Sequence, residues 1–506
     1  MSETRSGVRG VEWSGPEISR IARWLHSHAG LTFPPNRRES AELGIRRVMG
    51  RAGIKSVSEL GNRLERGGSL LDDLIAELTI GETFFLREPN QLEFIQREVL
   101  PAVSGRDGSC RAVRVWSAGC ASGEEPYSLA ILLQKTGCLN SASIIGTDLS
   151  VARLLTARRG RYRSWSLRGV PEAIINQYFE RDGGVFTLKP QLRSAVDFRL
   201  LNLAEDAYPS PATGVFGMDV ILCRNVLIYF DAHTVAQVAQ RLLNTLSDAG
   251  WLFLGASDPS LSGLVPCDVV MTGAGIAYRK PGAAKQFVPG TVFAWRPPSA
   301  DASDTAASSF PFPASHSHAQ HSTPDSSLSA PPASPLLPLP AHSDIERAYA
   351  ASDYERVASM AHELLASGDP TELVSVALVR SLANRGMMEE AARECAAALA
   401  RNSMSAELHY LAGMLQAQGG EHEEAARSAR RALYLDPELT IAHLALAEAL
   451  ARTGDSRAAK TALRNAEKLL AAVPADSRVR ATDGETASRL LHIARFRLRT
   501  LTFTKT

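Results

Sequence analysis

One stretch, residues 113–133, constrains the fold of this chain more than any other. It combines a β-branched and aromatic strand that begins at Val113, a loop of small residues that ends at Gly123, and an apolar helix opened by Glu124 and Glu125. Strand, glycine loop and helix in this order are how an α/β sheet holds a nucleotide-like ligand at the carboxyl end of a strand. The sequence therefore predicts such a sheet, with a ligand site at this loop.

The chemistry of the loop narrows the class of ligand. Gly119 and Gly123 stand alone, so the loop is not the G-x-G-x-x-G fingerprint, and it has no Lys-Ser/Thr pair of a P-loop. Two acidic residues directly after the glycines would repel a pyrophosphate. They would suit a ligand that carries positive charge, such as S-adenosylmethionine. An ordinary strand-to-helix turn is the alternative interpretation.

Strands and helices alternate from residue 111 to residue 280, which favours a parallel sheet. A second strand ends at Asp148, 25 residues past Gly123, near the place where a Rossmann-like sheet positions an acid on ribose hydroxyls. The alternative role for this aspartate is a helix N-cap. Residues 184–188 and 196–200 predict two antiparallel strands of a small excursion from the sheet.

Residues 1–85 predict a self-contained helical domain with four amphipathic helices. The second helix carries Arg46, Arg47 and Arg51, of which the last two are four residues apart and share a face. These arginines form either a solvated basic face or a docking surface for an acidic partner. The helical pattern breaks at Gly81, where we expect an interdomain hinge.

A period of 34 residues organises the last third of the chain. Ala391, Ala425 and Ala459 recur at this spacing, each near the start of a second helix that follows a glycine turn. Such a period, with small residues where two helices cross, resembles the tetratricopeptide repeat. Residues 281–342 are rich in Pro, Ser and Ala and predict a disordered linker that spans on the order of 45 Å as a flexible coil. We therefore expect the repeats to move as an independent module.

Composition excludes several classes of protein. A net charge of +1 gives no global basic field for nucleic acid. Six cysteines without a C-x-x-C pair predict reduced thiols in a cytosolic protein, not disulfides or a zinc site, and no other metal site is visible. The N-terminus is polar and no apolar run reaches about 18 residues, so we expect a cytoplasmic protein without membrane insertion.

Residues 79–280 carry five motifs in order, TIGETFFLREP, VWSAGCASGEEPYSLA, IIGTDLS, LNL and CRNVLIYFD. With these motifs the chain resembles the bacterial chemoreceptor glutamate methyltransferases of the CheR family, and its repeats are similar to those of a known subgroup. The resemblance implies a Rossmann-like methyltransferase domain with a small β-subdomain, S-adenosylmethionine as cofactor, and the cytoplasmic domain of a methyl-accepting chemoreceptor as substrate. It divides the chain into an all-α domain (1–85), the methyltransferase domain (86–280), the linker (281–342), the repeats (343–475), and a capping helix with its tail (476–506).

The family pattern also implies roles for individual residues. The cofactor pocket would be lined by Gly81, Thr83, Arg87, Gly119, Glu125, Asp148, Asn202, Leu203, Asn225 and Val226. Gly81 stands where some members have Asn, so a side-chain contact is lost in this chain. Arg46, Arg47 and Arg51 would dock the methylation helix of a receptor. The excursion at 184–200 would correspond to the subdomain that binds a receptor tether in some members.

The implied reaction makes simple demands on the protein. A glutamate carboxylate is ionised at neutral pH, so its methylation needs no general base. We expect Arg87 to orient this carboxylate through bidentate bonds. Tyr229 either donates to the same carboxylate or is only a core aromatic. An inert methyltransferase fold with active repeats, and a different methyl acceptor, are the competing hypotheses. Partner binding, self-association and autoregulation all stay open for the repeats.

Overall fold

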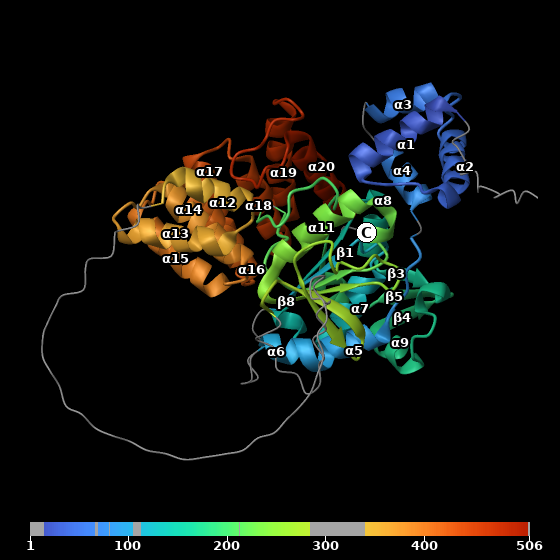
Figure 1. The fold of residues 1–506 in the computed structure, drawn as a ribbon, viewed down its shortest axis with the longest axis horizontal. Coiled ribbons are helices and arrows are strands. Elements are labelled where there is room, and N and C mark those ends of the chain that lie inside the picture. The colour runs from blue at the N-terminus through green and yellow to red at the C-terminus, as the bar shows by residue number, and fades with distance from the viewer. Residues whose placement is uncertain are drawn as a thin grey trace, which may run out of the picture.

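The computed structural model describes residues 15–65, 69–79, 81–104, 113–211, 213–283 and 340–503. Apart from its ends, the predicted linker lies outside the described residues, and the domain boundaries drawn from the sequence remain predictions. Figure 1 shows an N-terminal group of helices, a central sheet covered by helices, and a C-terminal array of helices. No helix within these ranges is long and apolar enough to cross a membrane.

The N-terminal helices match the four that the sequence predicts. They are α1 Pro16–Ala29, α2 Pro35–Arg51, α3 Val57–Glu65 and α4 Ser69–Leu78. Their apolar faces meet in one cluster that includes Ile21, Leu25, Ile45, Leu60 and Leu74. This small core of their own makes the four helices a separate layer that lies beside the central sheet.

The central sheet has the strand order β6-β2-β1-β7-β8-β10-β9 within the described residues. The strands are β1 Arg114–Ala118, β2 Ser143–Asp148, β6 Val196–Leu200, β7 Met218–Cys223, β8 Leu246–Leu254, β9 Asp268–Thr272 and β10 Gly275–Arg279. Neighbours from β6 to β8 run parallel, and β10 and β9 close the sheet as an antiparallel hairpin. The predicted parallel sheet is confirmed.

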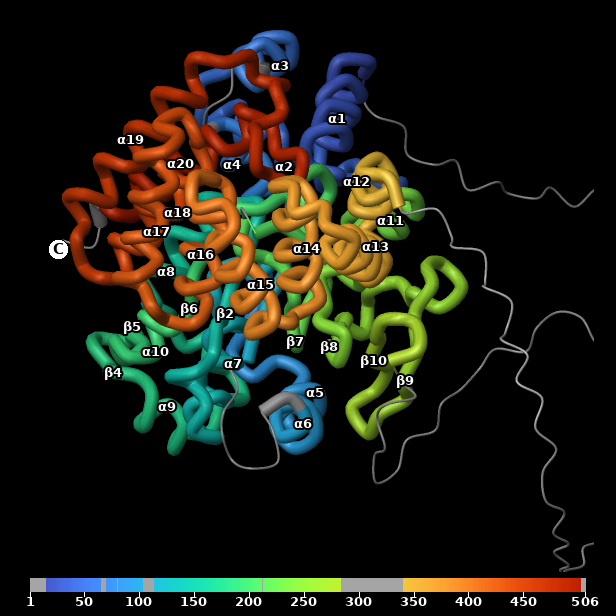
Figure 2. The backbone as a smooth tube through the Cα atoms, turned by 90° about the vertical axis from the view of Figure 1, so that its left-hand side faces the viewer, coloured from blue at the N-terminus to red at the C-terminus, as the bar shows by residue number. Residues whose placement is uncertain are grey.

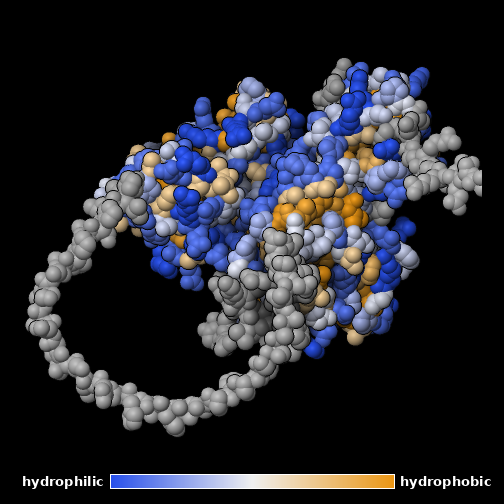
Figure 3. Space-filling model, viewed as in Figure 1, coloured by the Kyte–Doolittle hydropathy of each residue, from blue (hydrophilic) through white to orange (hydrophobic). Residues whose placement is uncertain are grey.

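Each face of the sheet has its own core, because successive strand residues point to opposite sides. On β1, Val115 belongs to the cluster beneath α7 (Glu124–Lys135), and its neighbour Trp116 belongs to the cluster beneath α11 (Ala232–Thr245). The other helical segments of this domain are α5 Pro89–Phe94, η1 Ile95–Val99, α6 Leu100–Ser104, η2 Leu139–Ser141, α8 Val151–Arg159, η3 Ser164–Leu167, α9 Glu172–Tyr178, α10 Pro190–Ala195 and η4 Leu227–Tyr229. Figure 3 shows that the largest apolar area on the visible face lies over this domain.

A second sheet of three strands forms a small subdomain beside the main one. Its order is β3-β5-β4, with β3 Arg161–Arg163, β4 Phe179–Asp182 and β5 Val185–Leu188. It contains the predicted strand at 184–188. The prediction that 196–200 belongs to the same excursion is wrong, because β6 runs parallel to β2 at the edge of the main sheet. Both segments are short and apolar, so sequence pattern alone could not identify the partner strand.

The C-terminal array consists of stacked helix pairs, followed by one long helix. The helices are α12 His342–Ala350, α13 Tyr354–Ala366, α14 Glu372–Asn384, α15 Met388–Arg401, α16 Ala406–Gln418, α17 His422–Leu435, α18 Thr440–Arg452, α19 Ser456–Ala471 and α20 Ala487–Phe503. The predicted period is carried by the buried Ala391, Ala425 and Ala459 and by the positive-φ turn glycines Gly386, Gly420 and Gly454. The predicted helical repeats are confirmed.

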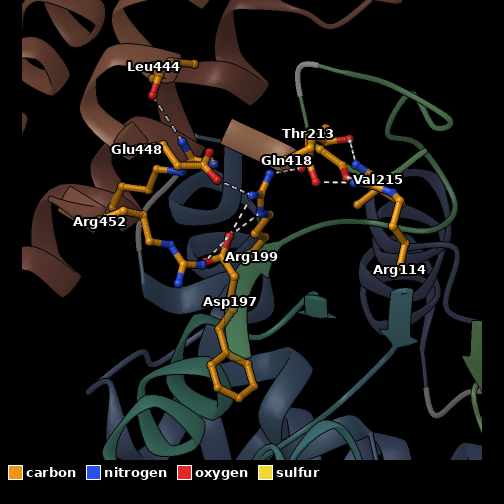
Figure 4. A network of polar contacts seen from close by, with 12 residues as sticks. Arg114, Asp197, Arg199, Thr213, Val215, Gln418, Leu444, Glu448 and Arg452 are labelled. Carbon is orange, nitrogen blue, oxygen red and sulfur yellow. Dashed lines mark hydrogen bonds and ion pairs between the residues drawn. The ribbon is translucent and has the colours of Figure 1, made fainter. Parts of the chain in front are cut away.

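The repeats do not stand apart as an independent module, contrary to the expectation from the linker. They pack against the β6 edge of the sheet, as Figures 2 and 4 show. Arg199 of β6 pairs with Asp197 at 2.7 Å and also with Glu448 of α18, and Arg452 of α18 lies 3.8 Å from Asp197. Phe216 of the sheet domain is buried in the apolar cluster of the repeats. A long linker permits docking as well as separation, so its length could not decide between them.

One repeat turn depends on this contact more than its equivalents do. A Cβ at Gly386 would lie 2.6 Å from the Cβ of Ser247 in the sheet domain. At Gly454, which has a similar φ of 88° and occupies the same repeat position, a Cβ would meet nothing within 4 Å. The first glycine therefore serves the seam between the repeats and the sheet domain as well as the turn.

We expect Gly386→Asn to open this seam, because asparagine tolerates a positive φ but its Cβ would overpack Ser247, at a cost of about 1–3 kcal/mol. Gly454→Asn is the matched control, with the same backbone demand and open space around it. Small-angle X-ray scattering should show a larger radius of gyration for Gly386→Asn only. Equal radii for the two variants would contradict the docked arrangement.

Candidate functional site

A cleft of about 900 Å³ opens at the carboxyl ends of β6, β2, β1 and β7. The chain leaves β1 toward β2 on one side and later returns with β7 on the other, so the cleft lies at the switch point where α/β sheets bind ligands. The structure brings together every cofactor-site residue predicted from the sequence. Among the residues lining the cleft are Gly81, Thr83, Arg87, Gly119, Glu125, Asp148, Asn202, Leu203, Asn225, Val226 and Tyr229.

Glycines shape the floor of the cleft where β1 turns into α7. Gly119 has a φ of 78°, and a Cβ there would collide with the side chain of Val226. Gly123 has a φ of 91°, and a Cβ there would lie 2.8 Å from the Cβ of Ala157. The loop thus stays close to β7 and α8, which leaves a backbone cradle at the strand end.

Asp148 ends β2 and binds the glycine loop. Its Oδ2 accepts a hydrogen bond from the Ala121 N–H and its Oδ1 one from the Ser150 N–H, both at 2.8 Å. Burial raises the pKa of this carboxyl, and nearby Arg153 and the backbone N–H groups oppose that shift. The N-cap of α8 is Ser150, whose side chain accepts from the Arg153 N–H, so the cap role considered for Asp148 is wrong.

The two acidic residues at the start of α7 face different surroundings. Glu125 lines the cleft, but its Oε2 already pairs with the Arg224 guanidinium at 2.6 Å and its Oε1 accepts from Ser117. Glu124 instead accepts hydrogen bonds from Ser122 and Ser166 and does not line the cleft. The expectation that both acids face a cationic ligand is therefore wrong, and Asp148 is the cleft carboxylate without an ion pair among the described residues.

The turn after β7 presents an unused hydrogen-bond acceptor. Asn225 has a φ of 59°, and Asp258 accepts from the backbone N–H groups of Asn225 and Val226. Burial raises the pKa of Asp258, while backbone N–H groups, that of Asn225 first among them, oppose this shift. The Oδ1 of Asn225 is buried and has no hydrogen-bond partner among the described residues. A buried acceptor of this kind is costly unless a ligand donates to it.

The predicted hinge is a packed wall of the cleft. Phe85 is buried between the rings of Tyr162 and Phe179, and its N–H donates to the Ser166 carbonyl at 2.9 Å. Two residues after Phe85, the Arg87 guanidinium donates to the Glu82 carbonyl at 3.3 Å. The hinge therefore places Arg87 in the wall of the cleft.

Gly81 makes room for an arginine that sequence reasoning missed. Arg153 of α8 lines the cleft and donates to the Thr79 carbonyl at 2.6 Å. A Cβ at Gly81 would lie 2.6 Å from its guanidinium carbon. Because Gly81 has no side chain, the Arg153 side chain from α8 occupies the space beside it.

The N-terminal helices cover the cleft from the other side. Leu31 and Ile75 line it and pack in one cluster with Tyr229. The ring of Tyr229 lies under the Arg37 guanidinium at 4.7 Å, so this tyrosine is both a cleft residue and part of an interdomain core. Gly30 permits the close approach, because a Cβ there would lie 2.6 Å from the Cβ of Ala204.

Sequence reasoning missed several cleft residues for different reasons. Arg224 follows the apolar strand β7, so a polar residue after a buried strand was an available signal. Leu31, in the loop after α1, and Ile75, on α4, carry no such signal, because single apolar residues of this kind are common in any helical domain. Only the packing of two domains turns them into cleft residues.

The three arginines proposed for docking lie outside the cleft on α2. Arg47 and Arg51 each bind Glu77 at 2.7 Å, and Arg46 binds Glu42 at 2.7 Å. Hydrogen bonds from Arg51 and then Arg47 lower the pKa of Glu77. All three side chains are more than half exposed, at 55%, 55% and 58%, so they remain accessible despite these pairs.

The chemistry of the cleft fits S-adenosylmethionine. Asp148 offers carboxylate oxygens at the strand end where a ribose sits in Rossmann-like sheets, and Asn225 offers a free buried acceptor that suits a ligand amino group. The glycine cradle leaves the space that a bound nucleoside needs.

Comparisons with known proteins agree with this fit. Residues 81–263 match the family model of the CheR methyltransferase SAM-binding domain, and residues 16–79 match the CheR methyltransferase all-alpha domain. Chemotaxis protein methyltransferase 1 of Pseudomonas aeruginosa is 35% identical over 273 residues, which cover 52% of this chain and 96% of that protein.

A second relative extends through the repeats. The probable biofilm formation methyltransferase WspC of Pseudomonas putida is 28% identical over 448 residues, which cover 87% of this chain and 96% of that protein. The similarity to the shorter relative, the two matched models and the geometry of the cleft lead to one conclusion. This chain belongs to the CheR methyltransferase family and is an S-adenosylmethionine-dependent protein-glutamate methyltransferase.

Proposed function

We propose that this protein methylates glutamate side chains in the cytoplasmic domains of methyl-accepting chemoreceptors, as part of adaptation in a chemosensory pathway. The observation that carries this proposal is Arg87, which lines the cleft beside the proposed cofactor residues and whose guanidinium has no carboxylate partner among the described residues. Relatives named chemotaxis protein methyltransferase support the choice of substrate. A cytoplasmic location follows from that substrate.

In the proposed cofactor site, different residues bind different chemical groups of S-adenosylmethionine. Asp148 accepts from ribose hydroxyls, and Asn225 Oδ1 accepts from the amino group of the methionyl part. Glu125, Asn202, Leu203, Thr83 and the backbone at Gly119, Gly81 and Val226 form the remaining walls. When bound, S-adenosylmethionine supplies an electrophilic methyl group on a sulfonium. The protein's own task is to align that group with an incoming carboxylate.

Arg87 meets this task through geometry. A planar guanidinium holds a carboxylate through two parallel hydrogen bonds, and it places one oxygen toward the methyl group. Tyr229 donates a further hydrogen bond in this proposal. Both attractions weaken as the carboxylate becomes an ester, so they contribute orientation, which is worth on the order of 7–11 kcal/mol in well-positioned reactions.

Leu31 and Ile75 exclude water from the same space. Water competes with the acceptor for the methyl group, so an apolar cover over the cleft protects the cofactor. The N-terminal helices therefore serve catalysis as well as docking. Arg46, Arg47 and Arg51 on α2 form the proposed docking surface for an acidic receptor helix.

The repeats are proposed to bind a further protein that is not identified. Met404 and Tyr434 are 71% and 83% exposed on the repeats, which is unusual for large apolar side chains and supports a contact surface there. The relative that shares the repeats is named for biofilm formation, so the pathway served is not limited to motility.

Arg87→Ala should abolish methyl transfer, lowering kcat at least about 100-fold because the carboxylate loses its orientation. Affinity for S-adenosylhomocysteine should stay within about tenfold, or 1.4 kcal/mol. Radiolabelled transfer to a receptor cytoplasmic domain and isothermal titration calorimetry measure the two quantities. Arg97→Ala, an exposed residue paired with Glu93, is the control. Complete loss of cofactor binding would instead place Arg87 wholly in the cofactor pocket.

Asp148→Asn should weaken S-adenosylhomocysteine binding by about 10- to 100-fold, because a charged acceptor becomes a neutral amide. Ser150→Ala is the matched control, since it removes the cap of α8, at about 1 kcal/mol of stability, but leaves the carboxylate in place. Calorimetric titration of both variants separates the roles. An unchanged affinity in Asp148→Asn would mean that the residue only supports the glycine loop.

Arg46→Ala should raise the KM for the receptor by about three- to tenfold and leave S-adenosylhomocysteine affinity unchanged, because a rim charge acts on the encounter with the substrate. Arg63→Ala on α3 is the control, since Arg63 also pairs with a glutamate four residues earlier. Steady-state kinetics at two ionic strengths check the result. Equal KM values for the two variants would support the solvated-face interpretation.

A further inference from the structure

One wall of the cleft is a short loop that follows β6. Leu201, Asn202 and Leu203 line the cleft from this loop. The Asn202 side chain is held by the protein at both ends, because its Nδ2 donates to the His28 carbonyl at 2.8 Å and its Oδ1 accepts from the Ala204 N–H at 3.0 Å. The loop thus enters the cleft as a preformed turn whose position depends on what supports it.

The support of this turn is the carboxylate of Asp206. Its Oδ2 accepts from the Asn202 N–H, and its own N–H donates to the Asn202 carbonyl at 2.9 Å. Asp206 is only 4% exposed, so its charge needs a partner inside the protein. Arg241 of α11 contributes from outside, where it donates to the Asp206 and Ala204 carbonyls at 2.9 and 2.8 Å.

The ion-pair partner of Asp206 comes from the C-terminal array. Arg489 of α20 pairs with the Asp206 Oδ2, and the same Nη2 donates to the Leu200 carbonyl at 3.1 Å. A single guanidinium therefore ties the end of β6 to the carboxylate that supports Asn202. α20 itself packs on α19 of the repeats (Figure 2) and against β6. It therefore connects the array to the strand that precedes the cleft loop.

A second buried acid, Glu485, lies at this seam. Glu485, just before α20, is 3% exposed, and burial, followed by the nearby Asp206, raises its pKa to about 8. At neutral pH this carboxyl is therefore mostly neutral. The ion pair of Arg489 is with Asp206, and its positive charge also lowers the pKa of Glu485.

We propose that Arg489 is a positioning residue for the cofactor cleft, through which the docked repeats set the affinity for S-adenosylmethionine. The inference rests on the proposed role of Asn202 and Leu203 in the cofactor site. Without Arg489, the buried Asp206 carboxylate has no ion-pair partner among the described residues. It must take up a proton or move toward solvent. A neutral carboxyl accepts more weakly from the Asn202 N–H and a displaced one no longer accepts from it, so either change loosens the turn that carries Asn202. The repeats are then a support of the catalytic domain as well as a surface for partners.

The test is S-adenosylhomocysteine titration of the full-length chain. Arg489→Ala should weaken binding by about 5- to 50-fold, a coupling of ordinary size for two linked sites. Arg489→Lys should recover only part of the affinity, because an ammonium does not reproduce the fork of a guanidinium. Arg495→Ala is the matched control on α20, since Arg495 is 53% exposed and pairs with Glu467 within the repeats. It should stay within about twofold of the parent chain.

Kinetics and a double-mutant cycle separate positioning from general loss of structure. Arg489→Ala should raise the KM for S-adenosylmethionine and leave the KM for the receptor unchanged, which global loosening would not do. Asp206→Asn keeps an acceptor for the Asn202 N–H and removes the ion pair. In its presence Arg489→Ala should add less than about twofold, because both changes act on one link.

Three outcomes are decisive. If the parent chain binds S-adenosylhomocysteine and Arg489→Ala binds it equally well, the inference is overturned and the proposed function stands. Additive effects of the two substitutions would also overturn it. If the parent chain does not bind the ligand at all, the proposed function itself fails. Should Arg489→Ala not fold, Arg489→Lys and Asp206→Asn, with thermal unfolding as the check, decide the same question.

Discussion

The buried carboxylate of Asp148 is the interaction on which the catalytic domain depends. It ends β2 and accepts hydrogen bonds from Ala121, in the loop after β1, and from Ser150, before α8. A buried carboxylate without hydrogen-bond donors costs free energy, so the bonds to Asp148 restrain the positions of these two N–H groups. The glycine loop is held against the sheet in this way, and the residue that binds it also lines the cleft.

Around this centre, parts that are distant in sequence complete one site. The β7 turn adds the free acceptor of Asn225, the hinge adds Arg87, and the N-terminal helices add the apolar cover of Leu31 and Ile75. The repeats add Arg489 behind the wall formed by Asn202. A family defined by its methyl-transfer domain thus has, in this chain, a site whose support extends into the C-terminal array.

Much of this was predictable from sequence, and the misses have physical causes. The parallel sheet, the four N-terminal helices and the repeats follow from local periodicity, which burial of one face imposes on each segment. The strand at 196–200 was assigned to the wrong sheet because the pattern of a short apolar strand does not indicate which strand it pairs with. Glu124 was expected to face the ligand because the sequence gives its position on the helix but not its neighbours Ser122 and Ser166, whose hydroxyls donate hydrogen bonds to its carboxylate inside the protein.

The sequence by itself determined the elements, the strand-end motifs and the family, because these depend on short-range order along the chain. Tertiary structure alone decided that the repeats dock on β6, that Arg153 lies beside Gly81, and that Arg489 reaches Asp206. The reason is physical. A buried charge is stable only beside a partner, and which residue becomes that partner depends on packing between segments hundreds of residues apart.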